Sequence, residues 1–143
     1  MKRISFIVAA IGVAGFSHAG EDIRQFVDMP KEARTELRLE MLDFQSALNN
    51  ILIALGDSNF SDAADTAEST IGISAMGRHR QSPINARPGM YMPDTMHAIA
   101  RNMHLAATDF ARTAKSGNLK ASLKALNSVT SACVACHRSY RTQ

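Results

Sequence analysis

The sequence predicts an all-α protein, an antiparallel four-helix bundle with its candidate functional site on the last helix. In four long stretches, apolar residues recur at spacings of three and four, and no segment alternates as a half-buried strand does. Turn-forming pairs, among them Gly56-Asp57 and Ser116-Gly117, separate these stretches. The length of 143 residues and the lack of an internal repeat indicate a single domain.

Residues 1–19 have the three parts of a secretory signal peptide. Lys2 and Arg3 precede an apolar run over residues 4–16, and small residues lead to a cleavage site near Ala19. The apolar run is too short for a permanent membrane anchor. We therefore expect an exported, periplasmic domain formed by residues 20–143.

The charge of the exported chain argues against one class of partner. The full sequence has 16 basic and 13 acidic residues, and residues 1–19 contain two of the basic ones and none of the acidic ones. The remaining chain carries 14 basic and 13 acidic residues, a net charge of +1. This near-neutral balance, without a basic stripe interleaved with aromatic residues, does not predict nucleic-acid binding.

The first two helices are predicted after Pro30 and after Ser61. Pro30 suits a first helical position, and Ser61 is a candidate N-cap. The inner face of the first helix is expected to comprise Leu37, Met41, Phe44, Leu48, Ile51, Leu52 and Leu55. That of the second is expected to comprise Ala63, Ala64, Ala67, Ile71 and Met76. The alanines allow close approach of a neighbouring helix or a flat ligand.

Residues 77–92 have no helical period and are interpreted as a long surface crossover. The segment contains two prolines and the cationic or titratable residues Arg78, His79, Arg80 and Arg87. Long loops in compact domains are often functional. Two interpretations remain open: a solvated connection, with His79 in solvent, or a docking patch for an acidic partner.

The third and fourth helices are predicted over residues 93–114 and 118–140. Their expected inner faces are Met96, Ile99, Ala100, Met103, Ala107, Phe110 and Ala114, and then Leu119, Leu123, Leu126, Val129, Cys133, Cys136 and Tyr140. Gly117 suits a left-handed C′ position and Asn118 an N-cap. Because the connection is so short, the two helices should be antiparallel neighbours.

The sequence Cys133-Val134-Ala135-Cys136-His137 is the attachment signature of a c-type haem. Cysteines at i and i+3 share one face of a helix, so both thiols can add to vinyl groups along one porphyrin edge. The next residue, His137, can ligate the iron from the proximal side. A redox dithiol or half of a zinc site uses the same spacing, but no second cysteine pair and no strand–helix–strand pattern accompanies it. We expect one covalently attached haem.

Cys133 to Arg141 resembles the last helix of the cytochrome c′ family, which reads Cys-x-x-Cys-His-x-x-aromatic-basic. The segment from Phe60 to Ala64 is also similar to the start of that family's second helix. The resemblance covers the helix layout of the exported chain and implies a bundle that binds haem c and meets periplasmic redox proteins. Members often form homodimers through their first two helices, although the charged outward face of the first helix here shows no apolar seam.

The resemblance places the family's distal-side residue near Met41, with Arg38 one turn before it. Members with an apolar residue there have five-coordinate iron that binds nitric oxide or carbon monoxide. Members with a methionine ligand are simple electron carriers, because a thioether raises the reduction potential and closes the iron. Met41 is the candidate distal ligand. It could equally fill core space, and Met29 or a histidine remains an alternative ligand.

Other side chains have lesser predicted roles. His97 and His104 flank the third helix and are expected at the surface, and Tyr140 is expected to pack against the porphyrin edge. Arg141 could bias the haem potential. Candidate haem contacts, from helical phase alone, are Leu48, Ala67, Met103 and Val129. Because no Ser-His-Asp order, carboxylate pair or phosphate-binding glycine loop is present, we expect an electron carrier or gas-binding protein and not an enzyme.

Overall fold

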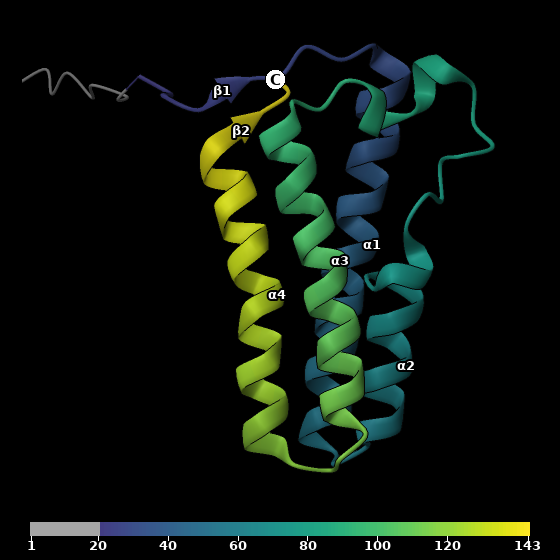
Figure 1. Cartoon of the computed structure of the whole chain (residues 1–143), viewed down its shortest axis with the longest axis vertical. Helices are drawn as coiled ribbons and strands as arrows, with labels where there is room; N and C mark the ends of the chain where they lie inside the picture. The colour runs from purple at the N-terminus through teal and green to yellow at the C-terminus, as the bar shows by residue number, and fades with distance from the viewer. Residues whose placement is uncertain (1–20) are drawn as a thin grey trace, which may run out of the picture.

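Four helices form an antiparallel bundle in the computed structural model, which describes residues 21–143 (Figure 1). They are α1 (Lys31–Gly56), α2 (Phe60–Thr70), α3 (Asp94–Ala114) and α4 (Leu119–Ser139). The predicted all-α bundle is therefore confirmed. The signal peptide predicted for residues 1–19 lies outside the described residues. Within residues 21–143, no helix is long and apolar enough to cross a membrane.

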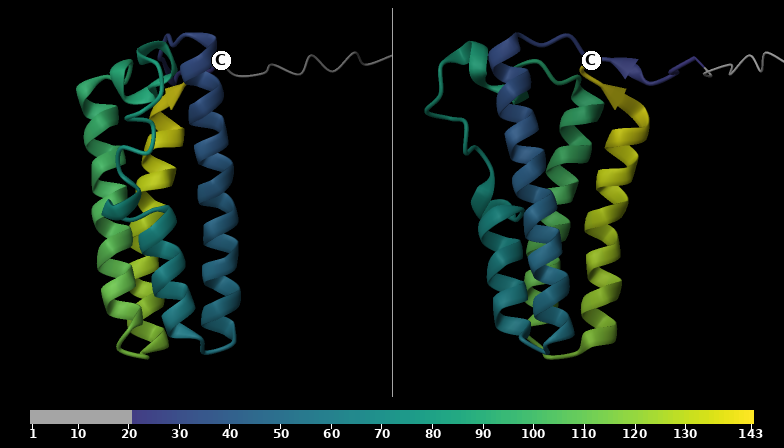
Figure 2. Two further views of the ribbon diagram at one scale, coloured as in Figure 1. Left: turned by 90° about the vertical axis from the view of Figure 1, so that its right-hand side faces the viewer. Right: turned by 180° about the vertical axis from the view of Figure 1, so that it is seen from behind.

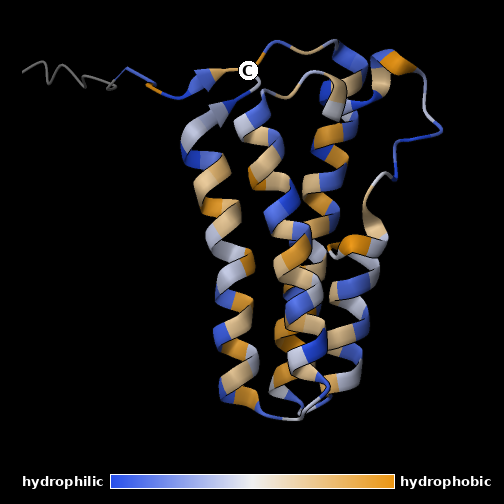
Figure 3. Ribbon diagram, viewed as in Figure 1, coloured by the Kyte–Doolittle hydropathy of each residue, from blue (hydrophilic) through white to orange (hydrophobic). Residues whose placement is uncertain are grey.

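The core has two parts along the bundle axis. The main cluster is built from inward residues of all four helices, centred on the fully buried Ile51, Phe110 and Val129. A smaller upper cluster lies where the segment before α1 meets the end of α4, and its buried members are Val27, Met29, Ala33, Leu37, Met96 and Tyr140. Apolar and polar residues alternate along each helix with helical spacing (Figure 3). The predicted inner faces of α1 and α3 are confirmed in most positions.

Several predicted inner residues are exposed. Leu52 is 55% exposed, Leu119 45% and Leu123 46%, while Met76 lies beyond the end of α2 and is 39% exposed. Of the inner positions predicted for the fourth helix, Leu126, Val129 and Tyr140 are confirmed as buried. The prediction was wrong for Leu119 and Leu123, because α4 packs extensively against α3 and not against α1. Only one side of its apolar stripe is therefore covered, and the small Ser122 is buried on that side.

The helix ends confirm two of the four predicted signals. Pro30 is the N-cap of α1, with ψ 151°, and not its first helical residue as predicted. Asn118 caps α4, its Oδ1 accepting from the amide of Ala121 at 2.9 Å, and Gly117 has a φ of +72°. The predicted Ser61 cap was wrong. Asn59 is the N-cap of α2, and its Oδ1 accepts from the amide of Asp62 at 3.3 Å. Asn and Ser are comparably good caps, so the sequence alone did not separate the two positions.

Two short strands were missed. β1 (Gln25–Phe26) pairs in parallel with β2 (Tyr140–Arg141), and the amide of Val27 donates to the carbonyl of Arg141 at 2.8 Å. The segment before α1 is thus paired with the chain end. Tyr140 is extended, with φ −130° and ψ 152°, so α4 ends one residue before the predicted limit. Strands of two residues are too short to show alternation.

The crossover between α2 and α3 contains the 3-10 turns η1 (Ile73–Ala75), η2 (Ile84–Ala86) and η3 (Pro88–Met90). Three of its cationic or titratable side chains, those of Arg78, His79 and Arg87, contact other residues. Arg78 forms an ion pair with Asp43 of α1 at 2.6 Å. The His79 ring lies 3.6 Å from Glu36 and 3.5 Å from Glu40, and its side chain is only 16% exposed. The expectation of a solvated His79 was wrong, because a histidine between two carboxylates docks the loop on α1.

Glu68 of α2 joins α3 and η1. It accepts from the Thr108 hydroxyl at 2.6 Å and from the Ser74 amide at 3.0 Å. Burial raises the pKa of this carboxyl, but the hydrogen bonds from Ser74 and Thr108 outweigh burial, and the net pKa lies below its usual value.

We expect Glu68→Gln to lower the free energy of unfolding by about 1 kcal/mol at pH 7. A carboxyl whose pKa is lower in the folded state stabilises above its unfolded pKa, and this stability is lost as the pH falls through the folded value. The difference in the free energy of unfolding between wild type and variant should therefore become smaller below about pH 4.5. Urea unfolding at pH 7 and pH 3.5 measures it, and a difference that grows in acid would contradict the prediction.

Candidate haem site

The two cysteines lie on one face of α4, close to its C-terminal end. Both are free and half-buried. Cys133 packs against the main core cluster and Cys136 against the upper cluster. The spacing of i and i+3 therefore places two thiols side by side along the helix axis, at the boundary between the two clusters.

The environment of the thiols disfavours a redox dithiol. Burial raises the pKa of the Cys133 thiol. The pKa of the Cys136 thiol is raised mainly by burial and to a smaller extent by the charge of the nearby Cys133. Redox-active cysteine pairs need a lowered pKa, because the thiolate is the nucleophile. Thioether formation has a different requirement: addition of S–H across a vinyl group makes one S–C and one C–H bond, and the neutral thiol supplies both atoms.

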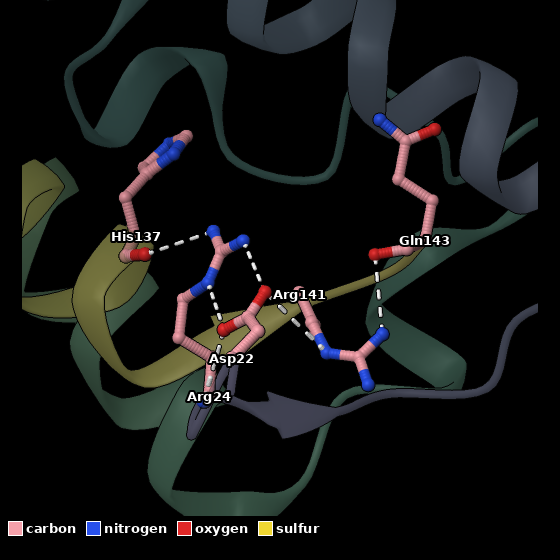
Figure 4. A network of polar contacts seen from close by, with 5 residues as sticks. All are labelled: Asp22, Arg24, His137, Arg141 and Gln143. Atoms are coloured by element: carbon pink, nitrogen blue, oxygen red, sulfur yellow. Dashed lines mark hydrogen bonds and ion pairs between the residues drawn. The ribbon is translucent and has the colours of Figure 1, made fainter. Parts of the chain in front are cut away.

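His137 follows directly and is exposed on the last full turn of α4. Figure 4 shows its imidazole pointing away from the polar network that surrounds its backbone carbonyl. Within residues 21–143, neither ring nitrogen of His137 takes part in a hydrogen bond. The ring is thus available as an iron ligand.

Met41 of α1 lies at the same height as the cysteines. It is half-buried and packs against both core clusters. Met41 is 15 residues from Gly56 and Cys133 is 14 residues from Leu119, and those two helix ends lie together at the bottom of the bundle. At a rise of 1.5 Å per residue, both side chains lie about 21–23 Å above that end.

The side of the bundle between α1 and α4 is the loosely packed one. Extensive backbone packing joins α1 to α2, α2 to α3 and α3 to α4, but not α1 to α4 within residues 21–143. Seen from behind, α3 is visible between them (Figure 2). The end of α4 carries two half-buried thiols with an available imidazole beside them, and α1 carries a half-buried thioether at the same height. The residues present therefore fit a haem held through Cys133 and Cys136.

The other candidate ligands are placed differently. Met29 is buried in the upper cluster, before α1 begins. The surface location expected for His104 was wrong: its Nδ1 lies 2.6 Å from the carbonyl oxygen of Ile71, and its ring meets Phe44 edge-on at 6.0 Å. His97 is exposed, as expected.

Tyr140 belongs to the upper cluster, against which Cys136 also packs. Its hydroxyl lies 2.5 Å from the Thr95 hydroxyl of α3, so the side chain is fixed by a hydrogen bond as well as by packing. The expected contact with the porphyrin edge stays a prediction. Leu48, Ala67, Met103 and Val129 all belong to the main core cluster or pack against it.

A polar network around the end of α4 was missed by the sequence analysis (Figure 4). Asp22 forms an ion pair with Arg24 at 2.7 Å, and Arg24 donates to the carbonyl oxygen of His137 at 3.4 Å. Arg141 lies 3.7 Å from Asp22 and stacks 5.1 Å above the Phe26 ring. No local pattern signals a contact between residues 113 positions apart.

A four-helix bundle with a Cys-x-x-Cys-His segment on its last helix defines a helical c-type cytochrome. A family model described as Cytochrome C′ matches residues 57–141, more than half of the chain and including this segment. The chain therefore belongs to the cytochrome c′ family, whose members bind haem c and are typically not enzymes. Comparisons with curated proteins and with solved structures gave no match.

Proposed function

We propose that this protein is a periplasmic electron carrier that binds one haem c through Cys133 and Cys136. His137 is the proximal iron ligand and Met41 the distal one. When bound, the haem supplies a one-electron redox centre. Family membership and the placement of the cysteines support the cofactor, and the predicted signal peptide supports the location.

The observation that favours electron transfer over gas binding is the place of Met41. A side chain that only filled the core would be expected within one cluster. Met41 instead packs against both clusters. Of the two cysteines, Cys133 packs against the main cluster and Cys136 against the upper one, and Met41 on α1 lies at the height of Cys133 on α4. A thioether at that place would complete the iron coordination and favour the reduced state.

The optical spectrum of the purified ferrous protein, with and without carbon monoxide, tests this proposal. We expect sharp low-spin bands that carbon monoxide does not alter. A broad high-spin spectrum that sharpens with carbon monoxide would establish an open iron, and gas binding would replace electron transfer as the function. A protein without a haem spectrum would exclude both.

The partners that this function requires are periplasmic redox proteins. In the crossover loop, Arg78 and His79 contact acidic residues of α1, and Arg87 donates to the Ser82 carbonyl at 2.7 Å. We therefore do not propose this loop as the docking patch for these redox proteins.

We also propose a homodimer that forms through α1. The outward face of α1 carries apolar as well as charged side chains, since Leu39, Leu42 and Ile53 are 51%, 59% and 57% exposed. Their spacing places them on one face with Ser46 and Asn49. We expect Leu42→Glu to shift the protein to a monomer in analytical ultracentrifugation, whereas Leu105→Glu on α3 should leave the dimer intact. A monomeric wild type at 100 μM would contradict the proposal.

A further inference from the structure

The segment before α1 is bound across the haem-bearing end of α4. This N-terminal strap, residues 21–29, contains β1 and pairs with β2 directly after α4. It buries Val27 and Met29 in the upper cluster beside Tyr140. The strap is therefore part of the folded bundle and lies against the turn that carries Cys136 and His137.

The last carbonyl groups of a helix have no partner within the helix. In α4, the carbonyl of Cys136 accepts from the amide of Tyr140, and the carbonyl of His137 accepts from Arg24 Nη1 at 3.4 Å. A cation at a helix C-terminus is also favoured by the helix dipole. Arg24 thus caps the carbonyl of the residue that would ligate the iron.

Asp22 holds the capping guanidinium in place. Its two oxygens accept from Arg24 Nε at 2.9 Å and Nη2 at 2.7 Å, a two-point arrangement that leaves Nη1 to reach His137. The hydrogen bonds from Arg24 lower the pKa of Asp22 to about 2, so the carboxylate is charged at neutral pH. Arg141, 3.7 Å away, adds a second cation to the same carboxylate.

We propose that Arg24 is a positioning residue for His137, anchored by Asp22, and that this pair holds the proximal ligand and contributes fixed charge beside the haem. The inference rests on the proposed haem attachment. It gives the strap a role that the bundle alone does not require, because α4 is already packed along α3. Removing the Arg24 cation should favour the ferric state, and removing the Asp22 anion should favour the ferrous state.

The test compares four variants of the haem-loaded protein. Arg24→Gln should lower the midpoint potential and change the low-spin electron paramagnetic resonance signal. Asp22→Asn should raise the potential, and Arg24→Lys should keep it near wild type. The matched control is Arg34→Gln, because Arg34 also donates to a carbonyl of the chain end, that of Thr142 at 3.2 Å, but not to His137. Its potential should equal that of wild type.

Hydrogen exchange at the Tyr140 amide gives a readout that does not need the haem. We expect exchange about three- to fivefold faster in Arg24→Gln than in Arg34→Gln, in apoprotein and holoprotein alike. The proposal is overturned if Arg24→Gln moves the potential no more than Arg34→Gln, or if Arg24→Gln and Asp22→Asn shift it in the same direction. A wild type without haem would overturn the proposed function, whereas normal haem with unmoved potentials would overturn this inference alone.

Discussion

On the proposed ligation, we expect replacement of Met41 with leucine to convert the haem from a six-coordinate, low-spin state to a five-coordinate state that binds carbon monoxide. Leucine keeps the apolar volume of methionine, so the contacts with the two core clusters are preserved and stability should change by less than about 1.5 kcal/mol. The variant removes only the sulfur. The ferrous spectrum should broaden, respond to carbon monoxide, and be accompanied by a lower midpoint potential.

The matched control for Met41→Leu is Met103→Leu. Met103 lies in the main cluster on α3 and is 7% exposed. Its substitution makes the same change of side-chain volume, but at a residue that packs in the main cluster alone. Its spectrum should equal that of wild type. If Met41→Leu retained a low-spin spectrum inert to carbon monoxide, Met41 would not be the ligand, and Met29→Leu would be the next variant to measure.

The helices were predictable because each one has a wide apolar stripe and ends at a local signal. Gly117 and Asn118 illustrate this: a left-handed backbone and a side-chain cap depend on the residues within one turn. The position of the cysteine pair on one face of α4 was predictable for the same reason, since residues at i and i+3 share a helix face.

The strap and the docked loop were not predictable because they depend on contacts between distant segments. Arg24 and His137 are far apart in sequence, and neither belongs to a pattern that signals the other. His79 sits in a segment rich in glycine, proline and charge, which normally indicates solvent exposure. It is sequestered because two α1 carboxylates, one turn apart, present a matching surface. The composition of the loop predicts solvent exposure, but the contacts with α1 determine where the loop lies.

The exposure of two α4 leucines was also not predictable, because it depends on which helix packs against α4. Leu119 and Leu123 fit the helical period as well as Ser122 does, and only the packing partner selects between the two sides of the stripe. Since α4 is covered by α3 and not by α1, the uncovered side remains half exposed. The loosely packed side of the bundle is thus a property that residue spacing cannot reveal, although the proposed haem site depends on it.

Replacing both Cys133 and Cys136 with serine will abolish covalent haem attachment. In wild type, the haem should stay with the protein after acid–acetone extraction and give a pyridine haemochrome typical of two thioether bonds. In the double variant, all haem should extract into the organic phase. The single variants should each retain a covalent haem with a haemochrome band shifted by the surviving vinyl group. Val134→Ser, an exposed position between the two cysteines, is the matched control and should behave as wild type.

The same double variant tests whether haem completes the fold. Because α4 packs extensively against α3 alone among the long helices, a haem bonded to Cys133 and Cys136 would add contacts from α4 toward the α1 side. Contacts between the attached haem and α1 exist only in the folded state and stabilise it, so the thermal midpoint should fall by about 10 °C in the double variant, corresponding to about 3 kcal/mol for a domain of this size. Helical circular dichroism should persist, since α1, α2 and α3 retain their shared core. An unchanged midpoint would mean that the bundle closes without the haem, and that the open α1–α4 side is not shaped to receive it.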